Sequence, residues 1–459
     1  MLGAHESPVS DGVSSRRLSR YLASPRFASL RHLDNPTPSV SVTCQSPKRI
    51  ARKREKSNLT PMKILFICEA VTLAHSARPV ALASFAARAG HDVVIAGAAD
   101  VTQKQTRFGA EWRGLTTIGP ARFSAALRAG RPVFTFADLD SYVAEDLRLI
   151  KATSPDLIVG DFRLSLCVSA RLAGIRYAAI TNAYWGAGCT QPMPMPELPM
   201  TRVLPLPVAQ ALFRLGSPWV MPLHCRPMNR LRARHGMPSL GNDLRAVYTD
   251  ADDLLYADIP GMFASQEMPA NHHFIGPIFW APEIDLPIWW NDLPTTKPVV
   301  YVTMGSSGSP QVLQGVLKCL AELPVTVIAS TAGADVSTLP DCPNLYLAPY
   351  LQGEQAARRA ALVVCNGGSM ACQQAFAAGK PVLGIASNMD QFLNMAGVMD
   401  VQAGLCLRAD RVAPKTLKQA IHTMIDSPVF RRSAQVLGNR QREYNSAERF
   451  LRFLSGRAS

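Results

Sequence analysis

A repeated unit of strand, turn, helix and strand is the feature that most constrains the fold of this chain. Residues 63–68 form an apolar run, Pro79 to Ala89 has the apolar spacing of a helix, and 93–96 is a second apolar run. Pro79 suits the first turn of such a helix. Parallel strands need a crossover connection of this kind, so the pattern predicts an open, doubly wound parallel sheet.

The same rhythm continues and then returns later in the chain. The predicted elements of the first half are a helix over 142–153, a strand over 157–160, a helix over 165–172 and a strand over 177–180. Those of the second half are strands over 299–303, 325–329, 361–364 and 381–385, with helices over 312–323 and after Gly368. The chain has 459 residues, whereas single cores stop growing near ~250–300 residues, so two domains are expected.

The domain boundaries follow from shifts in composition. Residues 62–280 form the predicted N-terminal domain, 281–298 a linker rich in Pro and Trp, and 299–459 the C-terminal domain, which ends in a helical, basic stretch over 429–454. Residues 183–240 break the rhythm because they are dense in Pro and Met. The fold class is therefore α/β, with two Rossmann-like doubly wound parallel-sheet domains.

The net charge of +14 is unevenly spread. Residues 1–61 hold 11 basic and four acidic residues, a balance of +7, without sustained periodicity, which is typical of a disordered extension. A uniformly basic nucleic-acid-binding protein is excluded, so we expect no nucleic-acid partner. No run of ~18 apolar residues predicts a membrane helix. The ten scattered cysteines, never spaced as C-x-x-C, favour reduced thiols and a cytoplasmic location.

Two polar residues follow strands of the first half. His75 lies in the predicted turn after 63–68, and Asp161 comes directly after 157–160. Ligands of open α/β sheets bind beyond the carboxyl ends of strands, so a histidine there is a candidate general base, and a carboxylate can orient it. Each also has a structural alternative, since either side chain can cap the helix that follows.

The second half carries the pattern of a diphosphate site. Asn366-Gly367-Gly368-Ser369 forms a turn between a strand and a helix, and Gly305, Ser306 and Ser307 form a second turn after 299–303. Glycines at such turns let backbone N–H groups reach a phosphate, aided by the helix N-terminus. Asp390 and Gln391, one strand later, have the chemistry to bind the vicinal hydroxyls of a sugar.

At these residues the sequence resembles the two-domain GT-B glycosyltransferases, and more narrowly the inverting UDP-sugar-dependent family that decorates plant flavonoids and bacterial antibiotics. The family signature runs His-Gly-Gly-x-Gly-Thr-x-x-Glu, then Gly-x-Pro, then Asp-Gln-x-x-Asn. The matching positions are Gly367, Gly368, Gly379, Pro381, Asp390, Gln391 and Asn394. The segment around His75 and the strand before Asp161 resemble the family's base and base-orienting positions, and its base-stacking aromatic falls near Tyr350.

The sequence departs from this signature at four positions. Asn366 stands where the family has His, Met370 where it has Gly, Ala371 where it has Thr, and Gln374 where it has Glu. Asn366 can donate an N–H to a phosphate but carries no positive charge, and Gln374 accepts less well from ribose hydroxyls. Diphosphate binding is then expected to depend more on backbone N–H groups.

The resemblance implies what the protein does. Two domains would face each other across a cleft, with the terminal helix packing back on the N-terminal domain. A hexose would pass from a UDP- or dTDP-linked donor to an acceptor hydroxyl with inversion, without a metal or other cofactor. His75 would be the base and Asp161 would orient it, while Gly305, Ser306, Ser307, Tyr350 and 366–369 with Gln374, Asp390 and Gln391 would bind the donor.

The acceptor is left open by the sequence. Met, Pro, Trp and Leu within 183–240 favour an apolar small molecule. A lipid acceptor is the first alternative, because Arg226, Arg230, Arg232 and Arg234 have the charge to bind an anionic membrane surface peripherally. A non-catalytic accessory protein of the same fold is the second, given the four departures from the signature. An epimerase would need further acid or base residues that the sequence does not offer.

Overall fold

The first α/β half is built on a seven-stranded sheet in which every pair of neighbouring strands is parallel. In this computed structural model the described residues are 60–98, 110–263, 268–279, 284–294, 296–305, 308–337, 339 and 342–456. The strands are β1 (Lys63–Cys68), β2 (Asp92–Gly97), β3 (Glu111–Gly114), β4 (Leu157–Asp161), β5 (Arg176–Thr181), β6 (Asp253–Tyr256) and β7 (His272–Phe274). Their order in the sheet is β3-β2-β1-β4-β5-β6-β7.

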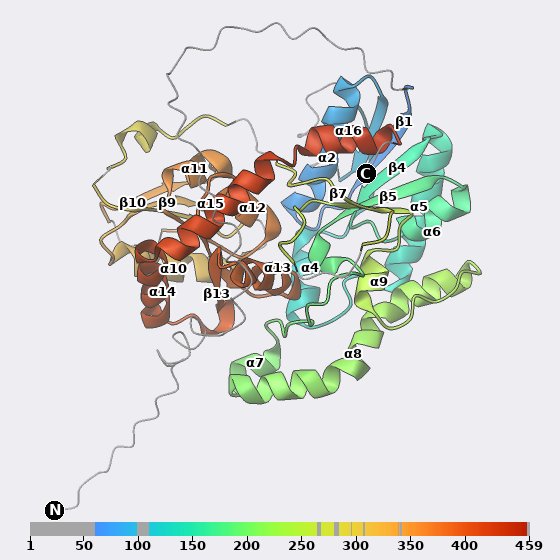
Figure 1. Ribbon diagram of the computed structural model, residues 1–459. Helices are drawn as coiled ribbons and strands as arrows, with labels where there is room; N and C mark the ends of the chain where they lie inside the picture. The colour runs from blue at the N-terminus through green and yellow to red at the C-terminus, as the bar shows by residue number, and fades with distance from the viewer. Residues whose placement is uncertain are drawn as a thin grey trace, which may run out of the picture. The chain divides into compact units, whose positions relative to one another are not determined.

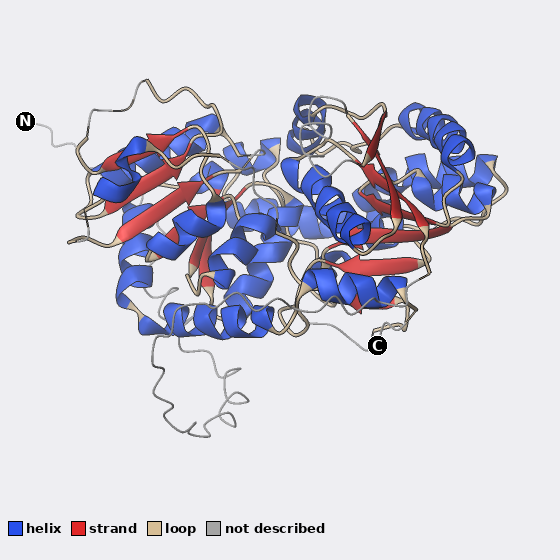
Figure 2. Ribbon diagram, turned by 90° about the horizontal axis from the view of Figure 1, so that it is seen from above, coloured by secondary structure: helices blue, strands red, loops and turns tan. Residues whose placement is uncertain are grey.

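The second half repeats this design with six parallel strands. They are β8 (Val299–Thr303), β9 (Thr326–Ser330), β10 (Leu345–Ala348), β11 (Leu362–Cys365), β12 (Val382–Ala386) and β13 (Gly404–Arg408), in the order β10-β9-β8-β11-β12-β13. In both sheets the order reverses beside the first strand, which is the switch point of a doubly wound fold. The predicted fold class is confirmed, and Figures 1 and 2 show both sheets with helices packed over them.

The helices fill the connections between strands. Those of the first half are α2 (Leu73–Arg88), α4 (Pro120–Arg128), α5 (Phe136–Thr153), α6 (Leu166–Ala173), α7 (Pro199–Val203), α8 (Leu206–Arg234) and α9 (Leu244–Tyr248), with the short helix η3 (Ala183–Trp185). Those of the second half are α10 (Pro310–Ala321), α11 (Gly353–Arg359), α12 (Ser369–Ala377), α13 (Met389–Asp400), α14 (Pro414–Asp426), α15 (Pro428–Arg442) and α16 (Ser446–Leu454), with η4 (Ile288–Asp292) and η5 (Ala409–Arg411). Among the described residues, none of these helices has the length and apolar character needed to span a membrane.

The start of α2 corrects the sequence prediction. The helix begins at Leu73, after the N-cap Thr72, so Pro79 lies inside it and not in its first turn. His75 is therefore in the first turn of a helix and not on a loop. Pro79 has no N–H to donate, so the carbonyl of His75 lacks its usual helical partner. The apolar face of α2 packs on the sheet through Val80 and Leu82, which offsets this loss.

Residues 183–240 also differ from the irregular segment that the proline content predicts. Half of them form α8 (Leu206–Arg234), a helix of 29 residues that holds Pro218, Pro222 and Pro227 in its interior. A proline in a helix interior removes one backbone hydrogen bond and tends to bend the helix. Its C-terminal part is anchored in the core through Cys225, Met228 and Leu231, whereas Ala209 is the one buried residue of its first half. Figure 1 shows α7 and α8 at the lower margin of the fold, where α8 changes direction.

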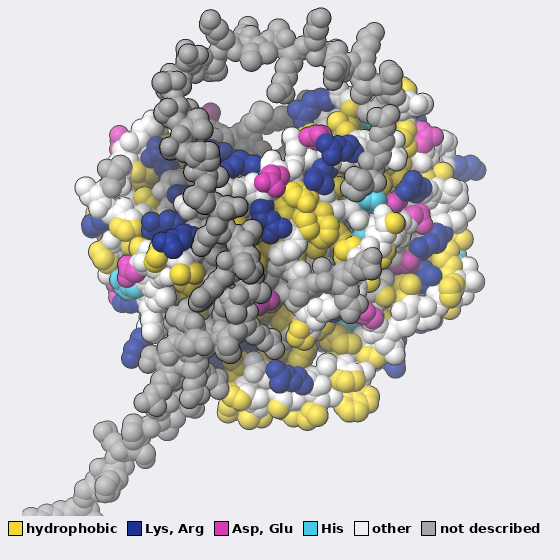
Figure 3. Space-filling view, in the orientation of Figure 1, with side chains coloured by type: hydrophobic (Ala, Val, Ile, Leu, Met, Phe, Trp, Pro, Cys, Tyr) yellow, Lys and Arg dark blue, Asp and Glu magenta, His cyan; other side chains and the backbone are white. Residues whose placement is uncertain are grey.

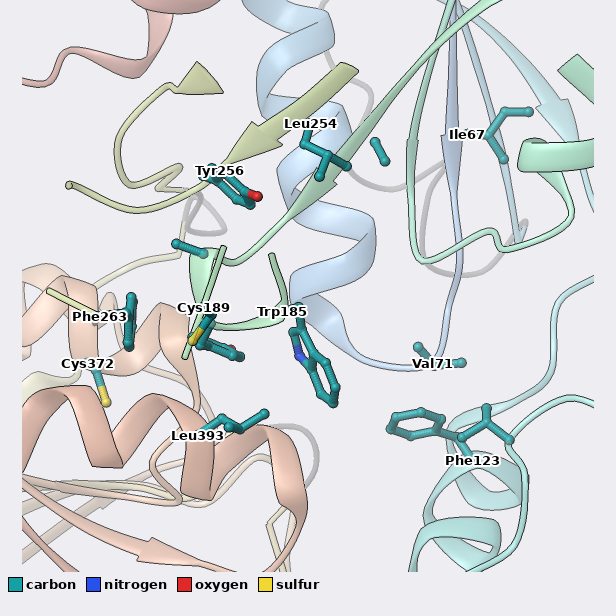
Figure 4. Packing of buried hydrophobic residues seen from close by; sticks show 14 of the residues in the cluster. Ile67, Val71, Phe123, Trp185, Cys189, Leu254, Tyr256, Phe263, Cys372 and Leu393 are labelled. Carbon is teal, nitrogen blue, oxygen red and sulfur yellow. The ribbon is translucent and has the colours of Figure 1, made fainter. Parts of the chain in front are cut away.

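One apolar cluster spans both halves, which belong to one compact unit, Ser57–Ser459. In Figure 4, Trp185 lies between Val71 and Phe123 on one side and Phe263 and Leu393 on the other. The cluster therefore fixes the carboxyl ends of the two sheets near each other. At the C-terminus, Phe450 of α16 packs against Phe66 of β1, with ring centroids 6.1 Å apart.

Candidate active site

The carboxyl edges of both sheets open into one large cleft of about 1120 Å³. Its walls include His75 and Asp161 from the first half and Gly305, Tyr350 and 366–374 from the second, apart from Gly367 and Cys372. Asp390 and Gln391 line the same cleft. The structure thus brings the predicted base and donor residues together. Ser306 and Ser307 lie outside the described residues.

His75 and Asp161 form a short hydrogen bond. The register pairs Cys68 with Asp161 at the ends of β1 and β4, and the helix that follows β1 brings His75 back over this edge. The distance from Nδ1 of His75 to Oδ1 of Asp161 is 2.6 Å. The side chain of His75 is 20% exposed while that of Asp161 is 1% exposed, so the imidazole faces the cleft from a buried carboxylate. Such a pair can remove a proton from a bound hydroxyl.

Neither residue serves as the helix cap that the sequence left open. The N-cap position of the helix after β4 is Ser165, four residues beyond Asp161, and its side chain makes no capping hydrogen bond. The N-cap position of α2 is Thr72, also without a side-chain capping hydrogen bond, and His75 is the third residue of the helix. The capping alternatives for His75 and Asp161 are therefore wrong.

Arg78 is the main residue of this site that sequence reasoning missed. Its Nε lies 2.7 Å from Oδ2 of Asp161 and its Nη2 lies 3.0 Å from Oδ1, a bidentate contact. Its Nη1 donates to Oδ1 of Asn182 at 2.8 Å. Burial opposes the charge on Arg78, but the attraction of Asp161 outweighs it and raises the pKa of the guanidinium. The spacing of His75 and Arg78, three residues apart on one helix face, was the available signal.

Asn182 links this acceptor-side cluster to the donor side. Its Nδ2 donates to Oγ of Ser369 at 2.9 Å and to Oδ2 of Asp258 at 3.0 Å. Asp258 also accepts from Nε2 of Gln373 on α12 at 2.9 Å. Burial raises the pKa of Asp258, while these hydrogen bonds act in the opposite direction. The chain of contacts from His75 to Ser369 joins the two halves through polar side chains.

The N-terminus of α12 provides the donors for an anion. Gly367 has a φ of +79°, a conformation that glycine adopts without strain. Its N–H lies 3.3 Å from Sγ of Cys365, and the N–H of Gly368 donates to Oδ1 of Asn366 at 3.0 Å. No side chain caps this helix, so its first-turn N–H groups, beginning at Ser369, face the cleft. The hydroxyl of Ser369 accepts from Asn182, so its own hydrogen is available to a phosphate.

The other residues predicted to bind the nucleotide-sugar donor lie around α12. Tyr350 is 57% exposed, so it is a surface ring at the cleft and not a core residue. Gln374 extends over Gly353, where an added Cβ would come within 2.3 Å of its Oε1. Gln391 is buried; its Oε1 accepts from the N–H of Ser387 at 2.8 Å and, in the capping box of α13, from the N–H of Asn388 at 3.4 Å. Its amide N–H groups are what it can offer to a ligand.

Asp390 is held by two aromatic residues from the first half. Oδ1 of Asp390 accepts from Nε1 of Trp185 at 2.8 Å and from the hydroxyl of Tyr184 at 3.0 Å. Burial and the nearby Asp390 carboxylate raise the pKa of Tyr184 well above its usual value, so this hydroxyl stays a donor. Both contacts are made by Oδ1, and Asp390 lines the cleft.

This chain is similar to glycosyltransferases over most of its length. A rhamnosyltransferase of Mycobacterium bovis, named for PGL/p-HBAD biosynthesis, is 42% identical over 402 residues, which is 87% of this chain and 87% of that protein. A glycosyltransferase of Mycobacterium tuberculosis, named for the same biosynthesis, is 40% identical over 406 residues, 85% of this chain and 90% of the relative.

The chain belongs to this family of glycosyltransferases. The family model for the C-terminal domain of erythromycin biosynthesis protein CIII-like proteins matches residues 311–446 of the enzyme. The crystal structure of the kitacinnamycin glycotransferase has a TM-score of 0.62 at 18% identity, covering 87% of this chain and all of that one. A spinosyn rhamnosyltransferase has a TM-score of 0.58 at 19% identity, covering 86% of this chain and 100% of its own. The resemblance to antibiotic-decorating GT-B glycosyltransferases is therefore confirmed.

The glycosyltransferase also holds a strained residue beside its histidine. Phe162, directly after Asp161, has a φ of +59°, which is uncommon for an aromatic residue. Its ring stacks on the imidazole of His75, with centroids 4.9 Å apart and planes inclined by 22°. Strain of this kind persists only where the surroundings hold it, and it is concentrated at active sites. No sequence signal marks this backbone conformation.

A buried ion network holds the chain on the far side of Phe162. Arg163 is fully buried; its Nη2 lies 3.0 Å from Oδ1 of Asp146 and its Nη1 lies 3.3 Å from Oε2 of Glu69. Its guanidinium also stacks over the ring of Tyr142, 3.6 Å from the centroid. Burial raises the pKa of Glu69 to about 8, despite the opposing effect of Arg163. The glycosyltransferase therefore fixes the Asp161–Arg163 segment from both ends.

Proposed function

We propose that this glycosyltransferase moves a sugar from a nucleoside-diphosphate donor to a hydroxyl of an apolar acceptor, with inversion and without a metal ion. The observation that carries the proposal is the 2.6 Å contact between His75 and Asp161 at the wall of the cleft. The same cleft is lined by Ser369 at the N-terminus of α12. A base and an anion site thus face one space.

The chemical step follows from this arrangement. Nε2 of His75 takes the proton of the acceptor hydroxyl, and the oxygen attacks the anomeric carbon. The bond from that carbon to the diphosphate oxygen breaks, so the electron pair leaves with the nucleoside diphosphate. Asp161 stabilises the imidazolium that results. A single displacement of this kind inverts the anomeric configuration.

The leaving diphosphate is bound by N–H groups and not by a cationic side chain of the signature. The first-turn N–H groups of α12 and the Ser369 hydroxyl supply the donors, and the helix dipole adds partial positive charge. Removing one such donor from a site where charge develops costs about 2.7–4 kcal/mol of transition-state stabilisation. Tyr350 stacks on the nucleobase, and Asp390 with Gln391 binds the sugar hydroxyls.

A rhamnosyl donor linked to thymidine diphosphate is the best-supported choice. One relative is named a rhamnosyltransferase. Structures of the related fold include a spinosyn rhamnosyltransferase with thymidine diphosphate, which covers 86% of this chain at 18% identity. The acceptor is proposed to belong to the PGL/p-HBAD type named for the relatives. The apolar cleft wall, with Leu127, Val220 and Met221, suits an aglycone of low polarity.

A donor and acceptor screen tests this function. Purified protein is mixed with dTDP-rhamnose, UDP-glucose or UDP-galactose, with and without phenolic acceptors, in the presence of EDTA. The expected result is acceptor-dependent release of nucleoside diphosphate that EDTA does not reduce, with NMR showing an inverted anomeric centre in the product. Retention of configuration, or loss of activity in EDTA that added Mg²⁺ restores, contradicts the proposed mechanism.

A further inference from the structure

The outer side of α8 carries an unusual concentration of exposed apolar side chains. Of the 14 exposed large apolar residues in the described part of the chain, seven lie within 203–223; of these, Leu212 and Val220 line the cleft and Val203 belongs to α7. Val208, Leu215, Trp219 and Leu223, here named the outer stripe, are 47%, 68%, 74% and 41% exposed. Their spacing of seven, four and four residues places them on one face of the helix. Figure 3 shows apolar side chains gathered over α7 and α8 at the lower margin of the molecule.

The other side of the same helix forms a wall of the cleft. Phe213, Ser217, Val220, Met221 and His224 line the cleft, whereas the four residues of the outer stripe do not. A helix that only closed a cleft would keep a polar face toward water. Apolar residues on both sides indicate that the outer side faces a second apolar phase.

The charge around the outer stripe has a single sign. The 29 residues of α8 include five arginines and no acidic residue. Arg214 and Arg226 are exposed and make no ion pair with the described residues.

Three arginines of α8 that the sequence groups with Arg226 are engaged elsewhere. Arg230 lies over the ring of Phe136, Arg232 pairs with Asp250, and Arg234 pairs with Asp140. The arginines of α8 that can still contact a partner are therefore Arg214 and Arg226, and not the whole arginine cluster at the end of the helix.

We propose that the outer stripe docks the enzyme on an anionic lipid bilayer. Trp219 would lie at the level of the headgroups, where tryptophan is enriched, with Leu215 and Leu223 at the acyl boundary. Arg214 and Arg226 would face anionic headgroups. Because the opposite side of α8 lines the cleft, an apolar acceptor held in the bilayer reaches His75 by passing around one helix. This last step rests on the proposed function, whereas the docking itself does not.

Vesicle flotation tests the docking. The full chain is mixed with vesicles of phosphatidylcholine alone or with 30% phosphatidylglycerol, and bound protein is quantified. Leu215→Ser/Trp219→Ser is compared with Ile288→Ser, which removes an apolar side chain that is 97% exposed on η4. The basic residues 1–59 are present in every variant, so differences report on α8.

The expected result is binding to the anionic vesicles that falls at least tenfold in Leu215→Ser/Trp219→Ser and less than twofold in Ile288→Ser. Arg214→Gln/Arg226→Gln is expected to weaken binding to the anionic vesicles and to leave the weaker binding to neutral ones unchanged. Absence of binding by the wild type, or equal binding by Leu215→Ser/Trp219→Ser, overturns the proposal. A dimer in light scattering that dissociates in this variant, without vesicle binding, assigns the stripe to a second copy instead.

Transfer assays separate this proposal from the proposed function. Leu215 and Trp219 do not line the cleft, so Leu215→Ser/Trp219→Ser is expected to keep the wild-type rate with a water-soluble acceptor. With an acceptor embedded in anionic vesicles, its rate is expected to fall at least fivefold. Stripe-dependent flotation without nucleoside diphosphate release from any donor would contradict the proposed function and leave the docking surface supported.

Discussion

Arg78 donates hydrogen bonds to both carboxylate oxygens of Asp161, from Nε to Oδ2 at 2.7 Å and from Nη2 to Oδ1 at 3.0 Å. Oδ1 of Asp161 also contacts Nδ1 of His75. A free carboxylate in this position could rotate away from the imidazole. The bidentate guanidinium fixes its plane, which makes Arg78 a positioning residue for the base.

Loss of the bidentate contact between Arg78 and Asp161 is expected to lower the rate of sugar transfer without weakening nucleotide binding. Arg78→Met should reduce kcat by about 10²-fold, the scale of a misplaced catalytic group. Arg78→Lys should recover only part of it, since an ammonium cannot bind both oxygens in one plane. The dissociation constant of the nucleoside diphosphate, by calorimetry, should change less than twofold. Arg88→Met, at the end of the same helix, is the control, and an equal loss there would show that Arg78 acts only through helix stability.

At Phe162 we expect a glycine replacement to be more stable than an alanine replacement, which is the reverse of the usual order. Its φ of +59° suits glycine better than alanine, because left-handed backbone costs a residue with a Cβ about 1–2 kcal/mol. Both variants lose the contact with His75, so both should lose activity. Urea unfolding should nevertheless show Phe162→Gly to be more stable than Phe162→Ala by about 1 kcal/mol. At the neighbouring Phe134, which has no such backbone conformation, alanine should be the more stable replacement.

Buried Glu69 makes stability depend on pH in a defined direction. The pKa of Glu69 is about 8 in the folded chain, whereas an unperturbed glutamate has a pKa of 4.5. Between these two pH values the folded chain therefore keeps a proton that the unfolded chain loses. The free energy of unfolding should therefore fall as the pH rises from about 5 to 8, by at most about 1.4 kcal/mol per pH unit from this group. Urea unfolding of Glu69→Gln should show a flatter pH dependence. An unchanged slope would mean that Glu69 is already ionised beside Arg163, and the exposed Glu448→Gln serves as control.

Gly353 tests the position of Gln374. An added Cβ at Gly353 would come within 2.3 Å of Oε1 of Gln374, and the flexible amide can move away. Gly353→Ala should therefore leave the thermal midpoint almost unchanged but weaken nucleotide binding about as much as Gln374→Ala does. The double variant should bind no more weakly than either single one, as expected for residues that act through one contact. Additive losses would show that Gly353 contributes independently.

Eight strands, β1, β2, β4 and β5 of the first sheet and β8, β9, β11 and β12 of the second, were predictable because a strand buried on both faces is a continuous apolar run. The strands β3, β6, β7, β10 and β13 were not predicted, and all of these except β6 are largely half-buried or exposed. The run over 299–303 coincides with β8, and that over 157–160 ends one residue before β4 does. The positions of His75 and Asp161 at the edge of the first sheet followed from the same pattern, because parallel strands place their carboxyl ends together.

The sequence was a poorer guide to the helices α2 and α8, because it was interpreted through local propensity. Pro79 and the prolines of α8 predict helix starts and breaks, yet both helices continue through them, and α2 packs on the core over the turn that follows Pro79. The contacts of Arg78 with Asp161 and of Asn182 with Ser369 join residues 83 and 187 positions apart. Such pairs depend on tertiary geometry, which no local pattern encodes. The strain at Phe162 is likewise visible only in the folded chain.

The role of His75 as the base can be measured by the rate of sugar transfer in His75→Ala. It should be measured in a single turnover, with saturating donor and a soluble acceptor, beside the nucleotide dissociation constant of the same protein. A general base contributes about 10²–10⁴-fold, so we expect a loss of rate in that range with unchanged nucleotide binding. Transfer by His75→Ala within threefold of the wild-type rate would contradict the claim that this imidazole, held by Asp161, removes the acceptor proton.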